Sequence, residues 1–121
     1  MNLPDFERHA QEWIAAWNEH DLEQILKHYA DDVEFHSPFA SKLTGRSSGT
    51  IQGKAALRDY FKRALDAYPT LHFEFLCLYA GVRSYVLEYR SVNNLIAAEV
   101  LEFNPSGKIQ KVLAHYHDEA Q

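Results

Sequence analysis

Apolar residues in the first part of the chain recur at the three- and four-residue spacing of helices. The first stripe predicts a helix with one aromatic face, formed by Phe6, Ala10, Trp13, Ile14 and Trp17. Asp21 followed by Gln24 reads as a capping box and predicts a short second helix ending near Ala30. A third helix is expected from Gly53 until Pro69 forbids its continuation.

A short strand and a long loop are expected between the second and third helices. Val33 and Phe35 alternate with polar residues, which predicts a strand that Pro38 stops or leaves at a sheet edge. Residues 40–52 are rich in Ser, Thr and Gly and show no periodicity. We therefore expect a long surface loop there, of a length that is often functional.

From Leu71 onward the apolar residues alternate by twos, which predicts four strands in series. Residue types that turn chains break the pattern at 80–81, 93–94 and 104–107. Strands joined by such short turns pair antiparallel. The sequence therefore predicts an α+β domain with three N-terminal helices and a mostly antiparallel meander.

Register decides which strand residues share a face. A four-residue loop at 104–107 would pair Glu99 with Val112. A two-residue turn at Asn93-Asn94 would set Glu88 opposite Glu99, whereas a three-residue turn pairs Glu99 with Leu87, and we prefer the latter because like charges repel. The expected inner face then consists of Tyr85, Leu87, Tyr89, Glu99, Leu101, Val112, Ala114 and Tyr116.

The opposite face of the expected sheet is apolar as well. It would carry Val86, Ile96, Ala98, Val100, Ile109 and Leu113. Three helices suffice to cover one face only, so the other face needs a separate cover. A second copy of the chain is the simplest cover, and we expect a homodimer through this outer face.

Composition narrows the class of protein and of partner. With 121 residues, 46% of them hydrophobic, we expect a single domain over residues 1–121. A net charge of -5 without a dense Lys/Arg run argues against nucleic-acid and anionic-membrane binding. The single cysteine, Cys77, fits a reducing cytoplasm, and no apolar run reaches the length of a signal peptide core or a membrane span. A small hydrophobic molecule is the expected partner in a cytoplasmic protein.

Glu99 and His36 are the candidate catalytic residues. A carboxyl on an apolar face has either a raised pKa or a specific partner, and both are typical of sites; the alternative is a rim charge paired with a cation. His36, next to Ser37 and Pro38, could act as a general base near neutral pH. Strict strand alternation, however, puts His36 on the opposite face from Ser37.

Aromatic residues could line a cavity for a flat apolar ligand, although aromatics at these spacings are also typical of ordinary core. The candidate ligand contacts are Trp13, Trp17, Phe35, Ser37, Phe61, Phe73, Tyr85, Leu87, Tyr89, Leu101 and Tyr116. His115 and His117 have a spacing that can chelate a metal, but the sequence assigns no third ligand. Neither a metal nor another cofactor is expected.

Three stretches carry a family resemblance: Trp-Asn-Glu-His-Asp-Leu (17–22), His-Tyr-Ala-Asp-Asp-Val-Glu-Phe (28–35) and Gly-Lys-Ala-Ala-Leu-Arg-Asp-Tyr-Phe (53–61). With the order of the elements, they resemble the nuclear-transport-factor-2-like superfamily, in its SnoaL-like branch, which is related to ketosteroid isomerases. The resemblance implies a cone-shaped, curved sheet with the three helices packed on its concave face around an apolar pocket, as in a cystatin-like roll. Members include isomerases, polyketide cyclases, dehydratases, epoxide hydrolases and proteins without chemistry, so fold alone does not decide function.

The ketosteroid isomerase pattern itself is mostly unmet. Where that family has an Asp general base before a proline, this chain has Ser37, which cannot abstract a proton as a carboxylate does. The family's helix tyrosine is matched by Trp13, and its protonated acid by Glu99. Glu99 alone retains its chemistry; ketosteroid isomerase is itself the standard example of a carboxyl kept neutral by an apolar site.

Two functions remain open from the sequence. One is a cofactor-free isomerase, cyclase or hydrolase, in which Glu99, with His36 as a possible partner, moves a proton on a small hydrophobic substrate. The other is a non-catalytic small-molecule-binding or dimerisation domain. An enclosed pocket that contains Glu99 would favour the first.

Overall fold

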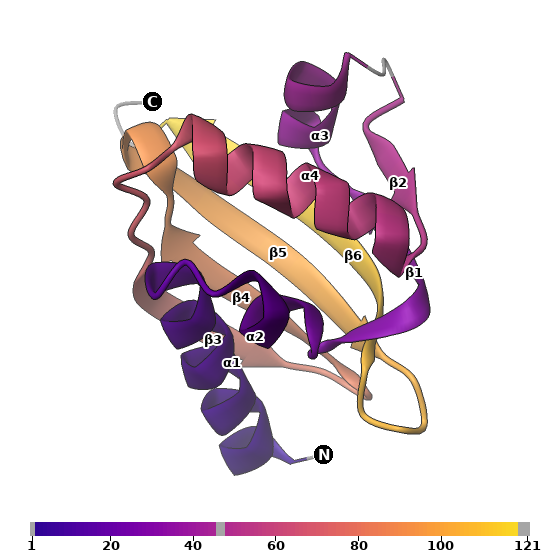
Figure 1. Cartoon of the computed structure of the whole chain (residues 1–121). Coiled ribbons are helices and arrows are strands. Elements are labelled where there is room, and N and C mark those ends of the chain that lie inside the picture. The colour runs from indigo at the N-terminus through magenta and orange to yellow at the C-terminus, as the bar shows by residue number, and fades with distance from the viewer. Residues whose placement is uncertain (1, 46–47, 119–121) are drawn as a thin grey trace.

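The computed structural model describes residues 2–45 and 48–118. Figure 1 shows its helices and strands. In chain order they are α1 (Leu3–Asn18), α2 (Leu22–Leu26), β1 (Tyr29–His36), α3 (Pro38–Thr44), β2 (Thr50–Gln52), α4 (Lys54–Ala67), β3 (Glu74–Ala80), β4 (Ser84–Arg90), the 3-10 turn η1 (Val92–Asn94), β5 (Leu95–Phe103) and β6 (Ile109–Asp118).

The strands form one curved sheet in the order β2-β1-β6-β5-β4-β3. β1 runs parallel to β6, and every other neighbouring pair is antiparallel. Helices α1 and α4 cross the same face of the sheet, and α2 lies between them (Figure 1). The expected α+β class, with a mostly antiparallel curved sheet and helices on one face, is confirmed.

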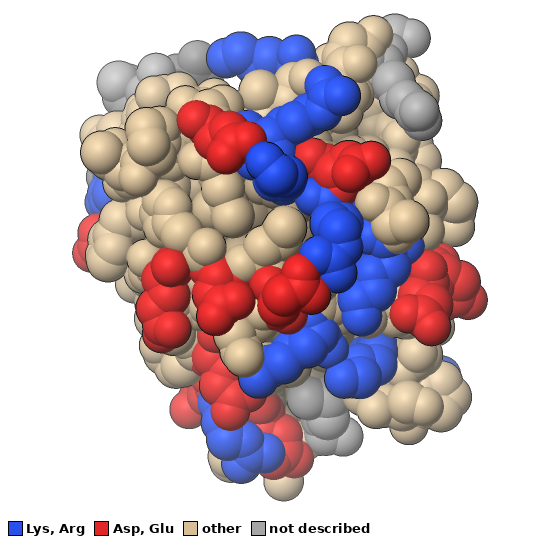
Figure 2. Space-filling view, viewed as in Figure 1, with Lys and Arg blue, Asp and Glu red and all other residues tan. Residues whose placement is uncertain are grey.

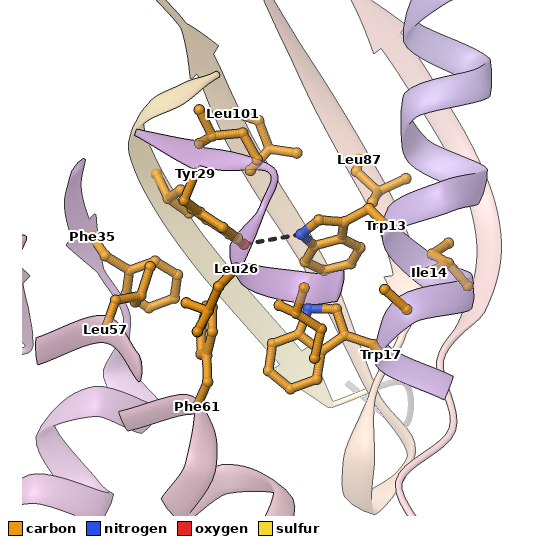
Figure 3. Packing of buried hydrophobic residues seen from close by; sticks show 14 of the residues in the cluster. Trp13, Ile14, Trp17, Leu26, Tyr29, Phe35, Leu57, Phe61, Leu87 and Leu101 are labelled. Atoms are coloured by element: carbon orange, nitrogen blue, oxygen red, sulfur yellow. Dashed lines mark hydrogen bonds between the residues drawn. The ribbon is translucent and has the colours of Figure 1, made fainter. Parts of the chain in front are cut away.

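Helix α1 follows the predicted aromatic stripe. Asn2 and Asp5 form a reciprocal capping box that satisfies amides of the first turn. The buried side chains of the helix include Phe6, Trp13 and Trp17, which pack toward the sheet. Figure 3 shows these tryptophans among the aliphatic and aromatic side chains of the core.

The long loop predicted for residues 40–52 is wrong, because part of this segment is helix α3 and part is strand β2. The Ser37 side chain accepts a hydrogen bond from the Phe39 amide and caps α3, and Pro38 occupies its first turn. The helix ends at Thr44, and its C-cap Gly45 has a φ of 74°, which suits glycine. Ile51 of β2 then pairs with Phe35 of β1. Residues 46 and 47 lie outside the described residues.

The second helix is shorter than the sequence predicted. It ends at Leu26 rather than near Ala30, and Tyr29 begins β1. In the sequence, Tyr29 continues the helical spacing from Ile25. In the structure it belongs to β1, where its fully buried side chain accepts a hydrogen bond from Trp13 through its hydroxyl. With α3, the described residues contain four α-helices in place of the predicted three.

The expected register is confirmed for one hairpin and wrong for the other. A three-residue turn pairs Glu99 with Leu87, as predicted. Glu99 pairs with Ala114 instead of Val112, because the next loop has only three residues and a bulge follows it in β6. The shift of two residues keeps the predicted faces. Ile109 is the exception, since it precedes the bulge and lies in the core instead of on the outer face.

Charged side chains of both signs cover the helical side of the molecule (Figure 2). Arg58 of α4 pairs with Glu23 of α2, and Lys62 pairs with Asp66 along α4. Such exposed pairs contribute little to stability but keep this side well solvated. No helix in the described part of the chain is long and apolar enough to cross a bilayer.

Two buried histidines lie at one end of the core. The centroids of the His9 and His28 rings are 4.8 Å apart, and His9 Nδ1 lies 2.8 Å from the Tyr85 hydroxyl. The Nε2 atoms of both rings are buried and have no hydrogen-bond partner among the described residues. Burial lowers the pKa of His9 to about 4, and it also lowers the pKa of His28. Both rings are therefore neutral at physiological pH.

This pair predicts a loss of stability in mild acid. The folded-state pKa of His9 lies below the ordinary value, so its contribution is complete above about pH 6.5 and is lost as the pH falls toward 4. We expect the loss to be roughly 3 kcal/mol for His9 alone. Denaturant unfolding of His9→Phe across this range should show a shallower dependence on pH than the parent. The same slope in both proteins would contradict the assignment, and the exposed His72 offers the control substitution His72→Phe.

Candidate functional site

A cavity opens between the helices and the sheet, at the other end of the core from the histidines. Its free volume is about 50 Å³. Helices α1, α3 and α4 and strands β1, β4, β5 and β6 contribute to its wall. Among the candidate residues it is lined by Trp13, Trp17, Phe35, Phe61, Phe73, Tyr89, Glu99 and Tyr116.

Glu99 is the acidic residue of the cavity wall. Its side chain projects from the middle of β5, between Leu87 of β4 and Ala114 of β6, and the residue is only 2% exposed. The Tyr89 hydroxyl donates a hydrogen bond of 2.6 Å to Glu99 Oε2. The alternative considered for Glu99 from the sequence, a charge at the rim paired with a cation, is therefore wrong.

Burial raises the pKa of Glu99 to about 7, although the hydrogen bond from Tyr89 acts in the opposite direction. Near neutral pH this carboxyl therefore exists in both protonation states. A group with that property can take up a proton and give it back without a large energetic penalty in either direction. Proton transfer is the chemistry that this position suits.

Hydroxyl groups extend from Glu99 along the cavity wall. Tyr60, Tyr89 and Tyr116 line the same cavity as Glu99. Burial raises the pKa of Tyr89 and Tyr116 above the ordinary value of a phenol. These hydroxyls remain protonated at neutral pH and act as donors rather than bases.

The two tryptophans of α1 differ in hydrogen bonding. Trp13 Nε1 donates to the Tyr29 hydroxyl over 2.9 Å, as the dashed line in Figure 3 shows. Tyr29 is fully buried and makes no other hydrogen bond to a described residue. Trp17 Nε1 is buried and has no partner in the described part of the chain. Both Tyr29 O–H and Trp17 N–H are therefore donors without a protein acceptor.

The structure places His36 outside the cavity. Its Nε2 lies 2.6 Å from a carboxylate oxygen of Glu34, and its Nδ1 lies 3.0 Å from the Thr50 hydroxyl. The ring borders a separate, open hollow together with Ser37 and His115. Strand alternation explains this placement, because His36 and the cavity-lining Phe35 project to opposite faces of β1.

Four candidate ligand contacts do not line the cavity. Ser37 is buried but serves as the cap of α3 and lines the outer hollow. Tyr85 bonds to His9, and Leu87 and Leu101 are fully buried in the core. Inner-face periodicity could not separate them from true lining residues, because the cavity occupies only one end of that face.

Sequence reasoning missed part of the wall. The additional lining residues are Tyr29, Phe39, Leu43, Tyr60, Ala64, Tyr68, Leu71, Ser91 and Val92. Phe39 and Leu43 belong to helix α3, which the sequence analysis does not predict. Tyr60 lies on the buried face of α4 with Leu57 and Phe61, and its helical spacing from Leu57 could have identified it.

His115 and His117 are both exposed on β6, on the outer side of the sheet. No group of three or more His, Cys, Asp and Glu side chains in residues 2–45 and 48–118 is arranged to bind a metal ion. The chemistry available in the cavity is that of the carboxyl, hydroxyl and indole groups named above.

Comparison with known proteins identifies the family. The family model described as a SnoaL-like domain matches residues 10–95. The chain belongs to the SnoaL-like family. No curated protein matches it. A SnoaL-like protein of unknown function from Burkholderia thailandensis is 40% identical, with a TM-score of 0.92 over 96% of this chain and 97% of that chain.

More distant SnoaL-like and cystatin-like structures share the fold. A protein of unknown function with a cystatin-like fold from Methylobium petroleophilum is 17% identical, with a TM-score of 0.77 over 98% of this chain and 79% of that chain. SalBIII, described as an epoxide hydrolase/cyclase-like enzyme in pyran ring formation in salinomycin, is 20% identical, with a TM-score of 0.73 over 92% and 89% of the two chains.

Within this SnoaL-like fold, the three positions compared with ketosteroid isomerases have different environments. Glu99 lies in the cavity, whereas the Trp13 N–H is already bonded to Tyr29 and the Ser37 hydroxyl caps α3. Of these three positions in the SnoaL-like protein, only Glu99 brings a carboxyl group to the cavity.

Replacement of Glu99 by Gln should stabilise the protein at alkaline pH. The folded-state pKa of Glu99 is raised, so its stabilising contribution is present below about pH 4.5 and is lost as the pH rises through 7. We expect Glu99→Gln to gain roughly 3 kcal/mol relative to the parent between pH 4.5 and 8. Urea unfolding at several pH values measures this difference. Glu102→Gln, on the same strand but outside the cavity, is the matched control, and an equal response of both variants would refute the burial effect.

Proposed function

We propose that this SnoaL-like protein is a cofactor-free isomerase that moves a proton within a small, apolar carbonyl compound. The observation that carries the proposal is Glu99, a carboxyl buried in an aromatic cavity with a pKa raised by burial to about 7. Carboxyls tuned in this way are typical of general acid–base sites.

The proposed reaction needs one acid–base group. Ionised Glu99 removes a proton from the carbon next to the carbonyl, and the C–H electron pair moves to form an enolate with the charge on oxygen. The Tyr29 hydroxyl accepts a hydrogen bond from Trp13, which polarises its O–H group. It then donates a hydrogen bond to the enolate oxygen. Protonated Glu99 then returns the proton to another carbon of the same conjugated system, which restores the carboxylate.

Isomerisation is favoured over hydrolysis or cyclisation by the position of His36. Opening an epoxide requires a proton donor for the oxygen and a base for the attacking hydroxyl or water. His36, the expected second group, is bonded to Glu34 and Thr50 outside the cavity. If the proposal fails, the experiment described next supports a non-catalytic binding domain instead.

Turnover of small β,γ-unsaturated ketones tests the proposal. 3-Cyclopentenone, followed by the ultraviolet absorbance of its conjugated isomer, is a suitable first substrate. The rate should rise as the pH increases through about 7, because the first step requires ionised Glu99. Glu99→Gln should lower the rate at least about a hundredfold. Equal rates in the two proteins, or no turnover of any such ketone by the parent, would support a binding role instead.

We also propose that two chains associate through the outer face of the sheet. Val86 pairs with Val100, and Val100 pairs with Leu113, so that partly buried apolar side chains lie side by side across three strands. Tyr79 of the neighbouring strand is 57% exposed. The other face is covered by helices, whose outward side is charged (Figure 2). An apolar sheet face of this kind supports burial against a second copy.

Sedimentation velocity tests the association. The parent should sediment as a dimer, and Val100→Asp should sediment as a monomer because a carboxylate in an apolar interface would lose its hydration. Leu3→Asp is the control, since Leu3 is an exposed apolar residue on α1 and lies on the helical side. A monomeric parent, or a dimer that survives Val100→Asp, would contradict the proposed interface.

A further inference from the structure

The indole N–H of Trp17 is a buried donor that the protein leaves unused. Trp17 is 5% exposed and lines the cavity, yet its Nε1 has no acceptor among the described residues. Trp13, one helical turn earlier on the same face, donates to Tyr29. A buried donor without an acceptor is costly, and such groups are rare in native proteins unless water or a ligand completes them. Because the Trp17 ring lines the cavity, a ligand bound there is the candidate for the missing acceptor.

Packing fixes the orientation of this donor. The Trp17 ring contacts Phe61 edge to face at 4.8 Å between centroids, and it also packs against Phe73 at 5.4 Å. The indole is held between α4 and the segment before β3, so it cannot turn its N–H toward the solvent without repacking the core. The acceptor for the Trp17 N–H must therefore be supplied by a molecule that enters the cavity.

The other polar groups of the wall indicate what kind of acceptor fits. Tyr29 provides a second donor without a protein acceptor, and Glu99 is a third donor when it is protonated. No Lys, Arg or His side chain is among the lining residues. A wall with several neutral donors and no cation suits an uncharged molecule that carries an oxygen acceptor on an otherwise apolar frame.

We propose that Trp17 determines ligand specificity, in that its Nε1–H binds the carbonyl or epoxide oxygen of a small uncharged ligand. The inference deepens the proposed function, because it concerns the same cavity. It requires that the cavity be occupied but not that Glu99 transfer a proton. The free volume of about 50 Å³ is smaller than the roughly 150 Å³ of an empty cavity that accommodates benzene, so a ligand with a five-membered ring fits only when wall side chains move apart.

A pair of isosteric probes separates this hydrogen bond from general apolar binding. Cyclopentanone offers an oxygen acceptor, and methylenecyclopentane has the same shape without one. The chain has 2 tryptophans, so proton–nitrogen NMR shows two indole signals, and Trp17→Phe assigns them. Cyclopentanone should shift the Trp17 signal downfield with saturation, whereas methylenecyclopentane should leave its hydrogen-bond shift unchanged.

A thermodynamic cycle measures how much the Trp17 hydrogen bond contributes to ligand binding. The parent should prefer cyclopentanone over methylenecyclopentane, as measured by the ratio of their dissociation constants. Trp17→Phe should reduce this preference about fivefold, the size expected for the loss of one neutral hydrogen bond. Phe73→Leu removes wall area but no donor, so it should weaken both probes and leave their ratio unchanged. A ratio that is the same in Trp17→Phe and the parent, or binding of neither probe to the parent, overturns the proposal.

Glu99→Gln distinguishes this inference from the proposed isomerase activity. The variant should lose turnover but keep the preference for cyclopentanone, because it retains the Trp17 donor. A parent that discriminates between the probes and yet turns over no ketone would sustain the role of Trp17 and refute the isomerase. Turnover by the parent without discrimination would refute the role of Trp17 and sustain the isomerase.

Discussion

The burial of the Glu99 carboxyl beneath an aromatic layer is the constraint on which the rest of the site depends. A carboxylate in such a place is unfavourable unless it is neutral or hydrogen-bonded, and the Tyr89 hydroxyl at 2.6 Å provides part of that compensation. Tyr89 and Tyr116 both line this cavity, and the charge of Glu99 adds to burial in raising the pKa of each.

The buried polar groups at the two ends of the core have different environments. At one end His9, His28 and Tyr85 lie among aromatic rings, and burial keeps the histidines neutral. At the other end the wall around Glu99 encloses free space, and the N–H of Trp17 has no acceptor. Histidines at the filled end contribute stability above about pH 6.5, whereas the carboxyl at the hollow end reduces it as the pH rises through 7. The hollow end is the one suited to bind a ligand.

The sequence predicted the faces of the sheet better than its exact pairing. Glu99 was placed on the inner face because side chains alternate along a strand, and a register error of two residues does not change the face. Helix α3 was missed although Ser37, Pro38 and Gly45 carry its start and stop signals, because the Ser, Thr and Gly content of the segment suggested a loop. Whether the Trp17 N–H finds an acceptor depends on the three-dimensional arrangement of distant residues, which periodicity does not encode.

The pKa of Glu99 in the parent protein tests the central claim most directly. A carbon-13 NMR titration of the side-chain carboxyl, assigned by the loss of its signal in Glu99→Gln, measures it without any substrate. The structure predicts a midpoint of about 7, because burial outweighs the hydrogen bond from Tyr89. A midpoint near 4.5, the ordinary value for a glutamate, would show that the carboxyl is solvated and would contradict a buried acid–base site.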